Sequence, residues 1–165
     1  MVWKPDVTVA AVVERDGRFL LVEEHMGQRL VINQPAGHLE ANESLREAVI
    51  REALEETAWS FVPESVSGIY LWPHPERPIS FLRVAFVGQV VQHHPERRLD
   101  HGIRRALWLS RNEVEQRSTQ LRSPLVLQCI DDYLSGARYP LSLLTHLGSP
   151  ESLITTRGLV GTHVI

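Results

Sequence analysis

The chain has 165 residues with a formal net charge of −3 and no basic block, which argues against a nucleic-acid-binding surface. Its apolar share of 43% is ordinary for a globular domain, and its length suffices for one hydrophobic core. No apolar run approaches a membrane span, and the first residues lack the apolar core of a signal peptide. We therefore expect one domain whose partner is a small molecule rather than a nucleic acid or a membrane.

The single cysteine, Cys129, excludes an internal disulfide and fits a reducing compartment, so we expect a cytoplasmic protein. It falls in an apolar helical pattern, which indicates a buried small residue. Nothing in the sequence indicates the oligomeric state.

The first third of the chain predicts strands. β-Branched and apolar residues fill 6–13, and Asp16-Gly17 is a hairpin-turn signal before a returning strand at 18–24. A short extended piece is expected at 30–33. It leads into Gln-Pro-Ala-Gly at 34–37, where proline and glycine predict an irregular loop.

A helix is predicted over 45–57. Ser44 is a favourable N-cap, and Glu47 three residues later completes the capping-box pattern. The pattern then returns to strands, with two helices near the end. The expected strands are 66–72, 79–91 and 103–109, and the expected helices are 111–117 and 121–135. Strands on both sides of a helix predict a mixed α/β class.

The face of this helix that should be buried carries carboxylates. An apolar stripe begins at Leu45 and continues at helical spacing onto Glu52 and Glu56, with Glu55 beside them. Buried unpaired carboxylates cost too much to be incidental, so they must be paired or hold a metal. Hard cations such as Mg²⁺ bind carboxylates together with waters and substrate phosphates. The alternative is a solvated charged face held by pairs at i,i+4.

The spacing of the residues around this helix extends the pattern. Five residues separate a glycine from a glutamate, seven more precede an Arg-Glu pair, and two precede a Glu-Glu pair. These positions are Gly37, Glu43, Arg51, Glu52, Glu55 and Glu56. The pattern resembles the Nudix box, the signature of the Nudix hydrolase family.

The resemblance implies an activity and a cofactor. Nudix hydrolases cleave nucleoside diphosphates linked to other groups, using Mg²⁺ or Mn²⁺. By this resemblance, Glu52, Glu55 and Glu56 look like the metal-binding carboxylates. A backbone carbonyl of Ala36 or Gly37 looks like a further metal ligand.

The resemblance also implies supporting roles and a fold. Glu43 and Arg51 look like a pair that orients the loop and the helix. The implied fold is an α/β/α sandwich with a mixed β-sheet over residues 1–145, followed by a C-terminal tail at 146–165 of unknown order. The chain departs from the box at its end, where Ala58 replaces the usual glycine; a neighbouring tryptophan replaces a small aliphatic residue.

Hydrolysis also requires a base that activates water. Other Nudix enzymes often use a glutamate in a later loop, and the comparable segment here is Asp100-His101-Gly102. Gly102 stands where that glutamate is sought, so Asp100, His101 or one of the helix carboxylates is the candidate. A turn role for Asp100 is the alternative.

Three residues in and near the predicted strands 66–72 and 79–91 are candidates for substrate contact. Arg83 lies inside a strand pattern and needs an anionic partner, which is either a core carboxylate or a substrate phosphate. Trp72 and Phe81 flank a proline-rich loop. They either stack on a heterocyclic ring or belong to the core.

A narrower resemblance joins three further stretches. Residues 33–41, 121–126 and 135–141 resemble the bacterial NudJ-type phosphatases of this family, within a likeness that covers about residues 2–145. That group implies phosphate release from nucleoside tri- and diphosphates. It also implies activity on thiamine-pathway diphosphates, including hydroxymethylpyrimidine diphosphate and thiamine diphosphate.

The C-terminal stretches suggest a wall on the substrate side. Arg122 and Arg138 are candidates for phosphate contact, and Tyr139 is a candidate for ring contact. Helix capping and packing are the alternative roles.

Two other functions stay open. The box fixes the chemistry and not the leaving group, so ADP-ribose or dinucleoside polyphosphates remain candidate substrates. The chain could also be a catalytically silent sensor that binds a nucleotide. Such proteins usually lose box carboxylates, which this chain retains.

Overall fold

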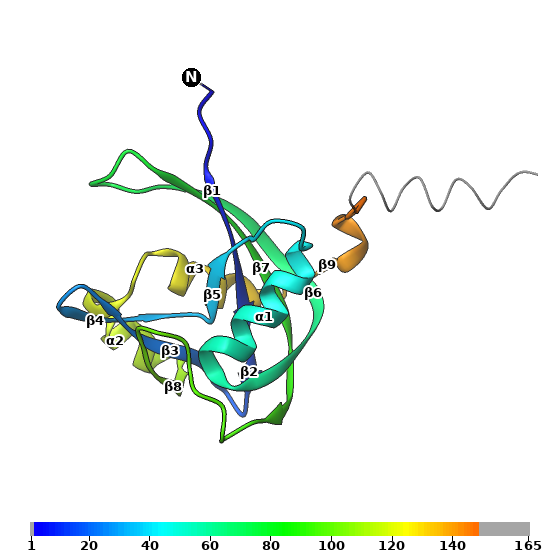
Figure 1. Ribbon diagram of the computed structural model, residues 1–165. Helices are drawn as coiled ribbons and strands as arrows, with labels where there is room; N and C mark the ends of the chain where they lie inside the picture. The colour runs from blue at the N-terminus through cyan, green and yellow to red at the C-terminus, as the bar shows by residue number, and fades with distance from the viewer. Residues whose placement is uncertain (1, 149–165) are drawn as a thin grey trace, which may run out of the picture.

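The computed structural model describes residues 2–148, and Figure 1 shows how their strands and helices are arranged. The strands are β1 (Asp6–Val12), β2 (Glu14–Arg15), β3 (Arg18–Met26), β4 (Arg29–Asn33), β5 (Ala36–His38), β6 (Trp59–Pro73), β7 (Ser80–His93), β8 (Ile103–Ser110) and β9 (Tyr139–Pro140). The α-helices are α1 (Leu45–Thr57), α2 (Arg111–Gln116) and α3 (Leu125–Leu134), with 3₁₀ turns at Ser118–Gln120 and Leu141–Leu143.

The strands form two sheets. Five strands pair in the order β5-β1-β7-β6-β9, in which β1 and β7 run parallel and the other neighbours are antiparallel. Strands β2, β4 and β8 pair with β3 to form the second sheet. The β6–β7 hairpin projects beyond the body of the molecule in Figure 1. The parallel pair makes the first sheet mixed, as the resemblance implies.

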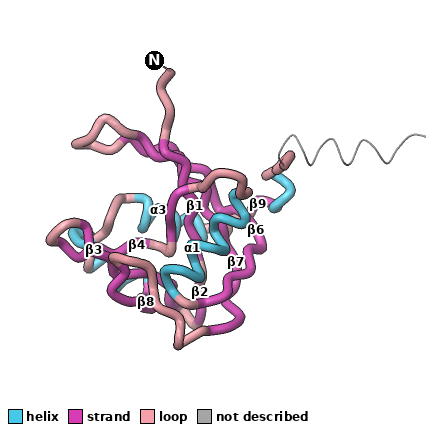
Figure 2. The backbone as a smooth tube through the Cα atoms, viewed as in Figure 1, coloured by secondary structure: helices cyan, strands magenta, loops and turns pink. Residues whose placement is uncertain are grey.

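Alternation along β1 and β7 supplies a core on each face of the first sheet. Val9 and Phe86 pack in the cluster that includes the apolar face of α1. Val12 and Ala85 lie an odd number of residues from Val9 and Phe86, so they face the other side and pack in a second cluster with Cys129 of α3. Helices α1 and α3 therefore cover opposite faces of the sheet, which Figure 2 lets the reader follow. The predicted α/β/α sandwich is confirmed.

The local predictions hold best where a cap or a turn residue defines the element. Helix α1 has the predicted bounds, 45–57. Strand β6 begins earlier than predicted, at Trp59, although Pro63 lies inside it. Proline cannot donate a ladder hydrogen bond, and the strand accommodates it with a bulge between Pro63 and Ser65.

Two further elements differ from the prediction. Helix α3 begins at Leu125 instead of residue 121, because Pro124 occupies its N-cap position and Leu121 instead bridges to Ile32 of β4. The expected loop at 34–37 in fact contributes to β5, which pairs with β1 at the sheet edge. Apolar periodicity alone does not reveal either change.

The proposed division into a domain at 1–145 and a tail at 146–165 stays a prediction. Residues 149–165, most of the tail, lie outside the described residues. Within 2–148, no helix has both the length and the apolar character required to cross a membrane.

The bulge in β6 depends on a glycine of β7. A Cβ on Gly88 would lie 2.1 Å from the Val62 carbonyl oxygen and 2.9 Å from the Pro63 Cα. Backbone atoms cannot rotate away, so we expect Gly88→Ala to destabilise the fold by about 1–3 kcal/mol. Thermal unfolding should show a lower Tm for this variant and little change for Gln89→Ala, an exposed neighbour. An unchanged Tm for Gly88→Ala would contradict this account of the bulge.

Candidate active site

Helix α1 is fixed at both ends by backbone contacts. The Ser44 hydroxyl accepts from the Glu47 amide at 3.1 Å, and the Glu47 carboxylate accepts from the Ser44 amide at 2.7 Å, which completes the capping box. At the other end Ala58 adopts a left-handed conformation with φ 57°. A glycine would take this conformation without the steric cost, which for alanine is roughly 1 kcal/mol. The helix thus keeps the geometry of the box despite the departure at Ala58.

Two carboxylates of α1 are buried, as the apolar stripe implies. Glu52 and Glu56 each expose only 8% of their surface. Burial raises the pKa of both groups, that of Glu56 to about 8, because desolvation disfavours the charged form. Nearby carboxylates, including Asp100, add to this effect. The site therefore concentrates acidic groups that lack sufficient positive charge.

Arg51 connects these carboxylates to the preceding loop. Its Nε and Nη2 donate to both oxygens of Glu43, at 3.0 and 2.8 Å, and Nη2 also donates to the His38 carbonyl at 3.0 Å. Its Nη1 donates to Glu52 at 2.7 Å and to Glu55 at 3.2 Å. These bonds lower the pKa of Glu43 and raise that of Arg51. The structure thus brings the expected Glu43–Arg51 pair together and adds two carboxylates to it.

The backbone of strand β5 lies very close to the glutamates of helix α1. A Cβ on Gly37 would lie 2.0 Å from the Glu52 carboxylate, so any other residue there would displace that carboxylate. The Ala36 amide donates to Glu56 at 2.9 Å. Because Pro35 bonds to the Ala11 amide and Ala36 is the next residue, both the N–H and the C=O of Ala36 point away from β1. The Ala36 carbonyl therefore points out from the sheet edge, on the same side as the amide that bonds Glu56.

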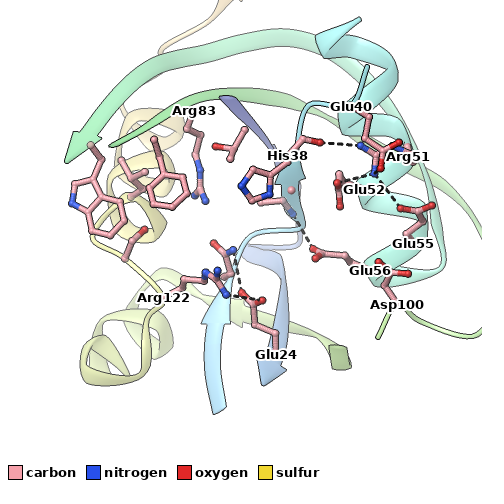
Figure 3. A pocket seen from close by; sticks show the side chains of 18 residues that line it. Glu24, His38, Glu40, Arg51, Glu52, Glu55, Glu56, Arg83, Asp100 and Arg122 are labelled. Carbon is pink, nitrogen blue, oxygen red and sulfur yellow. Dashed lines mark hydrogen bonds and ion pairs between the residues drawn. The ribbon is translucent and has the colours of Figure 1, made fainter. Parts of the chain in front are cut away.

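The carboxylates line one end of a pocket of ≈ 370 Å³, a volume typical of small-molecule sites. Figure 3 shows Glu52, Glu55, Glu56 and Asp100 together, with Arg83 on the opposite side. The lining comprises Thr8, Glu24, Asn33, Ala36, Gly37, His38, Glu40, Arg51, Glu52, Glu55, Glu56, Trp72, Phe81, Arg83, Asp100, Arg122, Ser123 and Leu125. One cavity thus unites residues from both sheets and two helical segments.

Several predicted residues meet in this pocket. Asp100 is exposed at the carboxylate end, where its amide donates to the Glu55 carbonyl at 2.9 Å. Arg122 lies at the other end and donates to Glu24 at 3.0 Å. Arg83 exposes only 7% of its surface, and burial lowers its pKa. Within residues 2–148 it has no ion pair, which argues against the core-carboxylate alternative.

Trp72 and Phe81 also line the pocket, where their rings stack on each other with centroids 5.8 Å apart. The two residues are cross-strand partners on β6 and β7. The cavity therefore has an aromatic wall at the end away from the carboxylates.

The expected wall from the C-terminal stretch needs correction. Tyr139 pairs with Val66 on β9 and lines a different cavity, so its predicted contact with a substrate ring in this pocket is wrong. Arg138 covers the Tyr133 ring at 4.1 Å and is also absent from the pocket lining. His101 does not line the pocket either. The β9 pairing directs this stretch to the far edge of the first sheet.

Sequence reasoning missed six polar residues of the pocket, which are Thr8, Glu24, Asn33, His38, Glu40 and Ser123. Glu24 ends an apolar strand pattern, and Asn33 ends the next one. Thr8 is a polar residue within the apolar strand β1, and Ser123 precedes α3. The signal that could have identified three of them is a polar residue in or at the end of an apolar strand.

The donor set fits a hard divalent cation in its chemistry. Glu52, Glu55, Glu56 and the Ala36 carbonyl are oxygen donors, and burial, with neighbouring carboxylates, raises the pKa of Glu52 and Glu56. In the described part of the chain, no three acidic, His or Cys side chains already surround a common point. Instead Arg51 pairs with two of the carboxylates, and the Ala36 amide pairs with the third.

Comparison with known proteins identifies the class. A family model described as NUDIX domain matches residues 3–128. The chain is 43% identical over 148 residues to Phosphatase NudJ of Escherichia coli strain K12, which covers 90% of this chain and 95% of that protein. A NUDIX hydrolase from Nitrosomonas europaea is 51% identical with a TM-score of 0.85, over 87% of this chain and 97% of that chain.

A more distant structure supports the fold alone. A MutT NUDIX hydrolase from Burkholderia pseudomallei is 17% identical with a TM-score of 0.67, over 79% of this chain and 98% of that one. The chain belongs to the Nudix family. It is a Nudix hydrolase similar to the NudJ phosphatases, and two glutamates of its box, Glu52 and Glu56, are buried.

The pKa of Glu56 predicts how the metal-free protein responds to pH. Its folded value of about 8 exceeds the ordinary 4.5, so the folded state binds this proton more tightly than the unfolded state. The resulting stability is complete below pH 4.5 and is lost as the pH rises through 8. In the presence of a chelator, we expect Tm to fall from roughly pH 5 to pH 8.5.

Glu56→Gln should reduce this decline, leaving the smaller part from Glu52, which shifts in the same direction. Glu115→Gln, an exposed change on α2, is the control. An equal decline in Glu56→Gln and wild type would contradict the assignment of the shifted pKa to Glu56.

Proposed function

We propose that this chain is a Mg²⁺-dependent, NudJ-like phosphohydrolase that also accepts Mn²⁺. Its substrates are nucleoside tri- and diphosphates and thiamine-pathway diphosphates, from which it releases phosphate. The similarity to Phosphatase NudJ over 90% of this chain supports this choice within the family. The free, buried Cys129 is compatible with a cytoplasmic location.

The observation that carries the proposal is the pocket's division into two ends. Buried carboxylates with raised pKa values form one end, and cationic and aromatic side chains form the other. A diphosphate bound between them would place its anhydride at the acidic end. Its remaining group would then face Arg83, Arg122 and the Trp72–Phe81 pair.

The residues of the acidic end have separate tasks. Glu52, Glu55, Glu56 and the Ala36 carbonyl hold the cation, and Arg51 positions two of these carboxylates through the bonds described above. A bound divalent cation supplies charge neutralisation on phosphoryl oxygens and lowers the pKa of water. The chain contributes the fixed positions of these donors and a cavity that excludes bulk water from their buried sides.

Asp100 is the candidate base. It is exposed at the carboxylate end of the pocket, within the electrostatic reach of Glu52 and Glu56. There its carboxylate can accept the proton that an attacking water loses. A carboxylate of α1 is the alternative base, and Asp100→Asn distinguishes the two through the loss or retention of turnover.

At the opposite end, Arg122 is the exposed cation and Arg83 the buried one. Arg122 is already paired with Glu24, which holds its guanidinium in place at the pocket wall. We assign Arg122 to a phosphate oxygen of longer substrates. Tyr139 is omitted from this set because it lies in another cavity.

Phosphate release with Mg²⁺ tests the proposal. The panel comprises nucleoside di- and triphosphates, thiamine diphosphate, hydroxymethylpyrimidine diphosphate and ADP-ribose, with phosphate measured against pyrophosphate. We expect phosphate from the nucleotides and from the thiamine-pathway compounds. Turnover confined to ADP-ribose would refute the NudJ-like assignment. Tight nucleotide binding without any product would favour a silent sensor.

Glu56→Gln should lower turnover by roughly 100-fold or more, because it removes a charged donor from the cation site. The fold should survive, since the amide keeps the shape of the carboxylate; circular dichroism and Tm check this point. Glu115→Gln on α2 should retain wild-type turnover. Near wild-type rates in folded Glu56→Gln would remove the assigned role.

A further inference from the structure

Four buried polar atoms of residues 2–148 have no hydrogen-bond partner, and all four belong to residues that line the active-site pocket. They are Thr8 Oγ1, Asn33 Oδ1, Arg83 Nε and Ser123 Oγ. Each residue exposes between 4% and 7% of its surface. Buried polar groups are nearly always satisfied, so each exception requires an explanation. A shared location in one cavity points to a ligand that supplies the missing partners.

The strand register places two of these residues side by side. Thr8 of β1 is directly opposite Arg83 of β7, so their side chains project from the same face of the sheet. Phe81 lies two residues before Arg83 and shares that face, and Trp72 is its partner on β6. Thr8, Arg83 and the aromatic pair thus belong to one continuous surface. Figure 3 shows Arg83, which belongs to this surface, across the pocket from the carboxylates.

The hydrogen-bonding character of Asn33 is fixed by its neighbour. Its Nδ2 donates to Glu24 Oε1 at 3.3 Å. The reverse orientation would put the amide oxygen against a carboxylate, which is unfavourable. The unpartnered Oδ1 is therefore an acceptor that requires a donor from the ligand. Arg83 Nε is a donor that requires an acceptor, and the hydroxyls of Thr8 and Ser123 serve either way.

This combination disfavours a phosphate group. Phosphate oxygens at neutral pH chiefly accept, and they would meet the Asn33 oxygen and the Glu24 carboxylate nearby. The required ligand therefore presents both a donor and an acceptor. A planar ring with those groups also stacks on an aromatic wall such as Trp72 and Phe81.

We propose that Thr8, Asn33, Arg83 and Ser123 form a subsite that binds a nitrogen heterocycle with an amino group beside a ring acceptor. The Asn33 oxygen accepts from the amino group, and Arg83 Nε donates to the ring acceptor. An oxo group at the amino position would face the Asn33 oxygen and be rejected. The inference rests on the proposed function, because it places the diphosphate of the same substrate at the carboxylate end.

Cytidine and uridine diphosphates test this selectivity, because they differ in the amino–oxo pattern of the ring. We expect kcat/KM of the wild type to favour the cytidine compound by roughly tenfold or more, since an oxo group leaves Asn33 unsatisfied. Asn33→Leu should bring this ratio close to one. Circular dichroism checks that Asn33→Leu is folded. An unchanged ratio in Asn33→Leu would overturn the proposal.

Thermal unfolding separates a binding role from a structural one. Thr8→Val and Ser123→Ala remove hydroxyls that have no partner, so Tm should remain equal or rise. Ser67→Ala is the matched control, because this equally buried hydroxyl donates to the Ala85 carbonyl at 3.4 Å and lies outside the pocket. Its Tm should fall by about 2–4 °C, with the cytidine preference intact. A lower Tm in both pocket variants would mean that these hydroxyls serve the fold.

Binding of nucleoside monophosphates to the metal-free protein tests the subsite independently of hydrolysis. Calorimetry with cytidine and uridine monophosphates requires no turnover and should show the same preference, weakened in Asn33→Leu. If the protein binds cytidine monophosphate more tightly but hydrolyses no substrate, the proposed function is rejected and the subsite is retained. Equal affinity for both monophosphates, or no binding of either, would overturn the subsite even if the enzyme is active.

Discussion

The arrangement of the acidic end depends on the guanidinium of Arg51. One planar group donates to both oxygens of Glu43, to the His38 carbonyl of β5 and to two helix carboxylates. A lysine presents a single ammonium and could not meet these partners at fixed angles. The loop after β5 and the helix α1 are therefore held in one register by a single side chain. Without it, the carboxylates of the helix would face one another with no positive neighbour among the contacts described.

Burial makes this arrangement costly for the protein on its own. Glu56 is nearly enclosed, and its carboxylate receives one backbone amide as its only described partner. Its raised pKa expresses a site whose electrostatic balance requires a cation beyond Arg51. At the opposite end of the pocket, the described buried polar atoms lack hydrogen-bond partners in the same way that the carboxylates lack a neutralising charge. The buried groups at both ends of the cavity therefore lower the stability of the chain when it is alone.

The sequence predicts the acidic end well and the other end poorly. The three glutamates lie on a capped helix, where their spacing defines which side chains share a face, and the resemblance to the Nudix box located Glu43 and Arg51. Thr8 and Arg83 become neighbours only through the parallel pairing of β1 with β7, which local periodicity does not reveal. Tyr139 was misplaced for the same reason, because its β9 pairing depends on tertiary contacts.

That parallel pairing also has a consequence for assembly. Strands β1 and β7 are separated by β2 to β6 and α1, so their contact closes a long loop, and such contacts form slowly. The glutamates of α1 lie on one local helix, whereas the ring-binding wall exists only after this closure. During folding, the acidic residues would therefore be grouped before the chain has any surface that distinguishes one substrate from another.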